Sequence, residues 1–254
     1  MAGVKETPRQ RMIGILYLVL LGLIALSVND SLLDAFKNIT DSLSTSTTNV
    51  NSGVEATFSS FEATKLKDDP IKAKPIYDKA KQASGYARDL ESYINDLKTS
   101  LTEQGGGINE SSGDLEGRAS VDISPRFMIN GGKATDLRKK ITETREKLLG
   151  LLDEKDRKTV KFSLSTIDPP RKGGVSKTWE EANFGDGIPL AAAMTALTKI
   201  QADVKNAESE MVKKILGKMD QAEINLDQFA AVAVAPTSYV IQGQPYMALP
   251  PTWR

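Results

Sequence analysis

Neither cysteine nor histidine occurs in this chain of 254 residues. The absence of cysteine excludes disulfides, thiolate nucleophiles and thiolate-bound zinc, and the absence of histidine excludes a Ser-His triad and imidazole ligands. A domain without cysteine also fits a compartment outside the reducing cytoplasm, provided that its fold does not depend on disulfides. An enzyme that works with carboxylates alone stays compatible with this composition.

Charge and aromatic content exclude a further class. Basic and acidic residues balance at 33 each, and aromatic residues make up 6% of the chain. There is no long basic block and no basic-aromatic platform, which argues against nucleic-acid binding. The P-loop, the dinucleotide-binding glycine motif and the nucleophile-elbow motif are also absent, and acid pairs such as Glu180-Glu181 sit in loops or where helices begin. We therefore expect a protein that is not an enzyme and that binds no metal and no cofactor.

One stretch, residues 12–28, carries no charge and is rich in Leu, Ile and Val. At about 1.5 Å per residue it spans roughly 25 Å as a helix, somewhat less than the roughly 30 Å hydrocarbon core of a bilayer. Thr7, Pro8 and Gln10 precede it with a Thr-x-x-Gln capping box and a proline at the first helical position. We predict a single transmembrane helix over 12–30, preceded by a helical turn that begins at Pro8.

Charges on the two sides of this stretch indicate its orientation. The basic residues before it are Lys5, Arg9 and Arg11, and the acidic residues after it are Asp30 and Asp34. The positive-inside rule then places residues 1–11 in the cytoplasm and the bulk of the chain on the other side of the membrane, after a single passage. The alternative is a signal peptide cleaved near 25–27, where Ala-Leu-Ser is an acceptable site. The helical pattern that continues past Asp30 favours an uncleaved anchor.

Several residues of this helix allow two interpretations. Arg9 and Arg11 are about 200° apart on a helical wheel, so at most one can face a given partner. Either both mark the cytoplasmic side, or one pairs with an acid of another chain. Gly14 and Gly22 permit close helix approach, although glycine is also common in membrane helices. Asp30 is either a proton site at the outer end of the membrane helix or an ordinary interfacial residue. The apolar stretch contains no carboxylate, so one that carries protons would come from a partner.

Four stretches show the heptad or three-four spacing of amphipathic helices. The first continues from the membrane segment to about Leu66, the second lies between Pro70 and Gly105, the third covers 134–154, and the fourth follows Pro189. They predict a mainly α fold, in which an elongated helical bundle over residues 31–225 stands on the membrane. Separate coiled-coil partners are the alternative. The buried faces are expected to contain Phe36, Leu43 and Val50; Ile76, Ala80, Ala83, Ala87, Leu90, Ile94, Leu97 and Leu101; Leu137, Ile141, Leu148 and Leu152; and Ala193, Leu197, Ile200, Val204, Ala207, Met211 and Ile215.

Alternating apolar residues interrupt the helical pattern twice. Val121 and Ile123 alternate in one stretch, and Val160, Phe162 and Leu164 alternate in the other. This period of two predicts that they pair as a small two-stranded sheet at one end of the bundle.

Two further segments have aromatic or turn signals. Trp179 and Phe184, in the loop before the fourth helix, are expected to cap the bundle core rather than to bind a ligand. Residues 226–254 read as a linker and the truncated start of a β-rich domain, because a turn at 236–238 precedes a strand pattern at 239–241.

The N-terminal residues resemble those of a known family. Met1-Ala2-Gly3, Thr7-Pro8-Arg9-Gln10-Arg11-Met12-Ile13 and Tyr17-Leu18-Val19 are similar to the start of the GldM/PorM family, the motor subunits of type IX secretion and gliding machinery. Tyr239-Val240-Ile241-Gln242-Gly243 also looks like the opening of that family's second periplasmic domain. The match is short but specific, because it combines these N-terminal residues with one membrane helix and a long helical region.

The resemblance implies an inner-membrane location for the helix and a periplasmic location for the bundle. It also implies a homodimer whose two membrane helices lie inside a ring of five copies of GldL, a multi-spanning partner. It implies a motor driven by the proton-motive force, in which Arg9 pairs with an intramembrane glutamate of the partner. Tyr17 would correspond to the family's membrane tyrosine, with Lys5, Arg11 and Asp30 as secondary candidates. In this family immunoglobulin-like domains follow the bundle and link the motor to outer-membrane components.

Two other functions fit the same architecture. One is a membrane-anchored periplasmic four-helix sensor, which normally needs a second membrane helix and a cytoplasmic output. The other is a passive coiled-coil tether, which would tolerate Arg9→Ala. The motor hypothesis therefore depends on Arg9 and on the partner.

Overall fold

The computed structural model describes residues 7–26, 30–160, 162–170 and 176–219. The described chain is mainly helical, as predicted, and no strand occurs in it apart from an isolated antiparallel bridge between Ile108 and Leu115. In chain order the elements are α1 (Pro8–Leu26), α2 (Asp30–Ala63), α3 (Lys65–Asp68), α4 (Pro70–Gln104), the π-helix η1 (Pro125–Asn130), α5 (Lys133–Gly150), α6 (Glu154–Thr159), α7 (Trp179–Phe184) and α8 (Leu190–Leu216).

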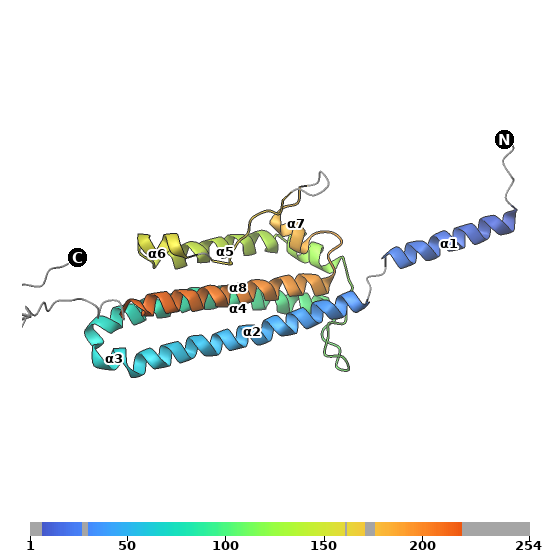
Figure 1. Cartoon of the computed structure of the whole chain (residues 1–254). Coiled ribbons are helices and arrows are strands. Elements are labelled where there is room, and N and C mark those ends of the chain that lie inside the picture. The colour runs from blue at the N-terminus through green and yellow to red at the C-terminus, as the bar shows by residue number, and fades with distance from the viewer. Residues whose placement is uncertain (1–6, 27–29, 161, 171–175, 220–254) are drawn as a thin grey trace, which may run out of the picture.

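Three long helices form the body of an elongated bundle (Figure 1). Helix α8 packs between α2 and α4, and α5 packs on α4. The short helix α3 connects α2 to α4, so these two helices run in opposite directions, while α2 and α8 run in the same direction. We call the end where α2 and α8 begin the proximal end, and the end where they finish the distal end. Helix α1 stands apart from the bundle beyond the proximal end.

Helix α4 shows why this sequence forms a tight bundle. Asp69 caps it by accepting a hydrogen bond from the amide of Lys72, and Pro70 occupies the first turn, where its missing N–H costs nothing. Its predicted seam is buried from Ala80 to Leu101, with alanine in the first half. Because alanine side chains are short, the backbones of α4 and α8 can approach closely there.

Helix α8 is the most buried element of the bundle. It begins directly after Pro189, as predicted, and all seven residues expected on its inner face are buried. The buried surface also includes polar residues on neighbouring positions, namely Thr198, Gln201, Lys205 and Glu208. α8 is therefore a central helix that has contacts on more than one side.

The predicted two-stranded sheet is wrong for the described residues. The sequence predicts a strand through Val121 and Ile123, but Ile123 lies just before the π-helix η1. Val160 and Leu164 are buried, and Leu164 lines a small cavity together with Ile141 of α5 and Ile200 of α8. The alternation records an extended segment with one face on a helical core, because any extended backbone sends alternate side chains to opposite sides.

The aromatic residues before the last helix lie where the sequence indicates. Phe184 is fully buried and Trp179 nearly so, and their ring centroids are 6.0 Å apart in an edge-to-face arrangement. They belong to a short helix and not to a loop, because Thr178 and Glu181 form a reciprocal capping box at its start. The amide of Trp179 also donates to a carboxylate oxygen of Asp168.

Helix boundaries differ from the prediction at two places. The first long helix is expected to reach about Leu66, but α2 ends at Ala63 and α3 follows after Thr64. The third is expected to reach Glu154, but α5 ends at Gly150. The continuity of α1 with α2 across 27–29 and the β-rich start at 226–254 lie outside the described residues.

Candidate functional site

The start of α1 has the predicted cap. The hydroxyl of Thr7 accepts a hydrogen bond from the amide of Gln10 at 3.4 Å, and the Gln10 side chain accepts one from the amide of Thr7 at 3.1 Å. The amide of Arg11 closes the first turn on the carbonyl of Thr7. This reciprocal cap fixes the helix start at Pro8 and places Arg9 in the first turn.

The surface of α1 is apolar around its whole circumference. Its large apolar side chains from Met12 to Leu21 are each more than half exposed, and Tyr17 is 62% exposed. None of the described residues of the bundle covers them. No helix is long and apolar enough to cross a membrane among the residues whose side chains the structure describes, which in α1 end at Gly22.

Small and basic residues divide α1 into two sides. A Cβ added at Gly14 or at Gly22 would meet no atom within 4 Å, so both positions are open. At about 100° per residue, Gly14, Leu18 and Gly22 share one face, Arg11 lies within about 20° of its centre, and Arg9 lies about 180° away. Both arginines are exposed, and among the described residues neither has an ion-pair partner. Lys5 lies outside the described residues.

Asp30 does have a partner. The guanidinium of Arg118 binds three carboxylates: Nη2 lies 3.0 Å from Asp30, and Nη1 lies 2.7 Å from Asp34 and 2.9 Å from Asp114. Hydrogen bonds to Asp34 and Asp114 raise the pKa of Arg118 above its ordinary value, so the side chain is always charged. We call these four residues the Arg118 cluster. It lies at the proximal end, where α2 begins.

The backbone beside Arg118 holds the start of α8. The carbonyl of Ser120 accepts a hydrogen bond from the amide of Leu190 at 2.8 Å, and that of Arg118 accepts one from the amide of Ala191 at 3.0 Å. The first amides of a helix have no partner within the helix, and Pro189 gives α8 no side-chain cap. The loop therefore supplies the missing acceptors.

A second charged group lies inside the bundle. Lys205 Nζ of α8 lies 2.9 Å from Glu91 of α4. It also lies 3.1 Å from Glu208 of α8 and 3.1 Å from Asn51 of α2. Burial would lower the pKa of Lys205, but hydrogen bonds and charge attraction from Glu91 and Glu208 outweigh it, and the pKa is raised. This group connects the three long helices.

Lys98 lies nearer the proximal end and has uncharged partners. Its Nζ donates to Thr198 and to Gln201, each at 3.0 Å, and the amide of Gln201 reaches Asn95 at 2.6 Å. Burial lowers the pKa of Lys98. These bonds connect α4 to α8 with polar contacts, where the sequence pattern marks only the apolar seam.

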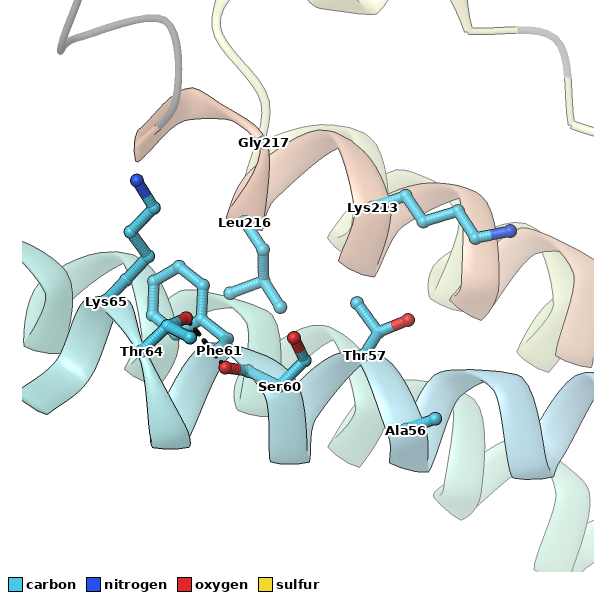
Figure 2. A pocket seen from close by; sticks show the side chains of 9 residues that line it. All are labelled: Ala56, Thr57, Ser60, Phe61, Thr64, Lys65, Lys213, Leu216 and Gly217. Carbon is cyan, nitrogen blue, oxygen red and sulfur yellow. Dashed lines mark hydrogen bonds between the residues drawn. The ribbon is translucent and has the colours of Figure 1, made fainter.

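Two grooves lie between the long helices in the described part of the chain. One of about 580 Å³ lies at the distal end between α2 and α8, where Phe61 and Leu216 form an apolar floor and Lys65 and Lys213 stand at the margins (Figure 2). A second groove, of about 640 Å³, lies between α2 and α4, and Lys205 of α8 also lines it. Within the described ranges, no three acidic side chains are grouped so that they could hold a metal ion.

The sequence indicated the capped start of α1 but not the Arg118 cluster. Asp30 and Arg118 are 88 positions apart, and no motif links them. Lys205 stands on a helical face whose spacing marks only apolar neighbours. Neither site had a signal in the sequence beyond the presence of the charges themselves.

The chain can now be compared with known proteins. A search among curated proteins finds no match. The family model described as the GldM N-terminal domain matches residues 31–218, which is most of the chain and corresponds to α2 through α8. The helical bundle and the resemblance of the N-terminal residues thus lead to the same assignment, and the chain belongs to the GldM/PorM family of gliding and type IX secretion components.

Proposed function

We propose that this chain is the inner-membrane motor subunit of a type IX secretion and gliding machine. Together with a multi-spanning partner like GldL, it would convert the proton-motive force into motion of its periplasmic bundle. The observation that carries the proposal is α1, an apolar helix with two arginines at its start and no cover from its own bundle. Family membership supplies the context.

The exposure of α1 supports its position in the membrane. A helix that is apolar on all sides needs apolar surroundings on all sides. Each large side chain gains about 1.5–3 kcal/mol on leaving water, so exposure from Met12 to Leu21 would be strongly unfavourable in solution. Basic residues before the helix and acidic ones after it favour a cytoplasmic N-terminus and a periplasmic bundle.

The two sides of α1 suit two kinds of contact. The open face with Gly14 and Gly22 allows a second copy of α1 to approach closely, which supports a homodimer. Arg9 then points away from the dimer axis, toward surrounding partner subunits. Tyr17 lies about 80° from Arg9 on the wheel, on the flank of the same outward side.

Arg9 also suggests the chemical step. α1 has no carboxylate of its own, so the proton carrier would be a glutamate of the partner. In low-dielectric surroundings Arg9 attracts this glutamate strongly while it is charged, and protonation removes the attraction. Two inner helices cannot be placed equivalently among five outer subunits, so each protonation favours a step of rotation.

Co-purification from native membranes tests the proposal. We expect this chain to bring down a multi-spanning protein with an intramembrane glutamate, in excess over itself. Recovery of the chain only as a free dimer would contradict the motor. Recovery with a cytoplasmic signalling protein would support the four-helix sensor instead.

A further inference from the structure

The first turn of α2 buries one large apolar side chain. Only residues 27–29 separate Asp30 from α1. Of the first residues of α2, Leu33 is buried at 1% exposure, whereas Leu32 is 50% exposed. The first amides of a helix also lack intrahelical partners, so this end has the fewest backbone restraints. Further along α2, the hydroxyl of Thr195 in α8 lies 2.9 Å from that of Thr40 and 3.2 Å from the carbonyl of Phe36. Apolar packing thus holds the first turn itself through one large side chain, Leu33.

The Arg118 cluster supplies the lateral restraint that packing does not. Asp30 and Asp34 are one helical turn apart on α2, and the two nitrogens of one guanidinium bind them at 3.0 and 2.7 Å. A planar guanidinium with two bound carboxylates restricts orientation as well as distance. Rotation of α2 about its own axis would break one or both contacts.

Arg118 is itself held to the rest of the bundle. Asp114, only 14% exposed, binds the guanidinium from the loop. The backbone carbonyls of Arg118 and Ser120 bind the first amides of α8. The contacts therefore form a chain from α2 through the Arg118 side chain and backbone to α8, which is the central helix.

We propose that the Arg118 cluster is the coupling that passes torque from the membrane helix to the periplasmic bundle, so that Arg118 is a positioning residue of the motor. This inference rests on the proposed function. Exposed ion pairs contribute little to folding free energy, and Asp30 and Asp34 are well exposed. The cluster accordingly serves orientation, and its loss should affect motion and not folding.

The test is Arg118→Gln in the full chain, expressed in cells with the partner. We expect the partner to co-purify as with the wild type and the thermal unfolding midpoint of the bundle to be unchanged, while gliding and secretion are lost. Asp30→Asn/Asp34→Asn, which changes only the α2 side, should give the same loss. Wild-type gliding in either variant overturns the inference.

Arg138 provides a matched control. It also bridges two acids, Asp168 at 3.1 Å and Glu180 at 3.0 Å, with similar exposure, but it connects α5 to α7 and not to α2. Arg138→Gln should therefore leave gliding intact. Equal loss of gliding in both arginine variants would mean that any bridging arginine matters, and it would overturn a specific role for Arg118.

Because the chain lacks cysteine, a chemical cross-link can replace the ion pair. In Asp34→Cys/Arg118→Cys, motion should be absent and should return when a bifunctional thiol reagent joins the two positions. No recovery at full cross-linking overturns the inference. Arg9→Ala, measured in parallel, separates the two proposals: if that variant moves normally, the motor mechanism itself fails, whatever the cross-link does.

Discussion

Lys205 and Glu208 lie one turn apart on α8 and form an ion pair inside the bundle, with 3.1 Å between Nζ and Oε2. Both side chains are less than a tenth exposed, and Glu91 approaches the same ammonium from α4 at 2.9 Å. A buried pair of this kind is costly to break, because the remaining charge is left without a partner in a low-dielectric site.

Lys205→Met should destabilise the bundle by about 3–5 kcal/mol, because it leaves Glu208 buried and unpaired. Urea denaturation followed by circular dichroism measures the loss. Lys199→Met is the matched control on the same helix, since Lys199 pairs with Asp203 but is mostly exposed; it should cost less than about 1 kcal/mol. Equal costs for the two variants would show that burial of Lys205 does not matter.

The stabilisation from Lys205 should disappear at high pH. The pKa of Lys205 is raised in the folded chain, so its contribution is fully present below the unfolded value of about 10.4 and is lost as pH rises through the folded pKa. The pKa of Lys98 is shifted in the opposite direction from that of Lys205, because burial lowers it. The difference in unfolding free energy between wild type and Lys205→Met isolates Lys205. It should be constant up to about pH 10 and shrink above it.

Arg9→Ala should abolish gliding and secretion without lowering the amount of protein in the membrane. In the proposed mechanism, removing the guanidinium would leave a carboxylate of the partner without its counter-charge in an apolar site. Arg11→Ala is the matched comparison, since Arg11 is the same residue type two positions away, on the opposite side of α1. It should retain more movement than Arg9→Ala in single-cell gliding assays. The reverse order would assign the partner contact to Arg11.

Ala83→Leu should destabilise the bundle by about 1–3 kcal/mol, because Ala83 is fully buried in the seam of α4. Ala35→Leu makes the same change at an exposed position of α2. Its effect should stay within about 0.5 kcal/mol. Thermal unfolding of the two variants under identical conditions gives the comparison, and equal midpoints would contradict the close packing.

The helices could be predicted where their signals are local. The capping box at Thr7 and Gln10 and the seam from Ala80 to Leu101 depend on residues a few positions apart, and the structure has both. Asp30 and Arg118 meet only because α4 returns the chain to the proximal end, and spacing in the sequence carries no record of that return. The strand predicted from Val160 and Leu164 was wrong for another reason. An extended segment on a helical core has the same period of two as a strand.

α2, α4 and α8 also determine how the domain extends the molecule. The chain travels outward along α2, back along α4, outward again along α5, back before α7, and outward a last time along α8 (Figure 1). An odd number of lengthwise passes means that the chain enters at one end and leaves at the other. With 34 residues in α2, this adds about 50 Å of reach. The domain thus acts as a spacer, because α2 begins at one end of the bundle and α8 finishes at the other.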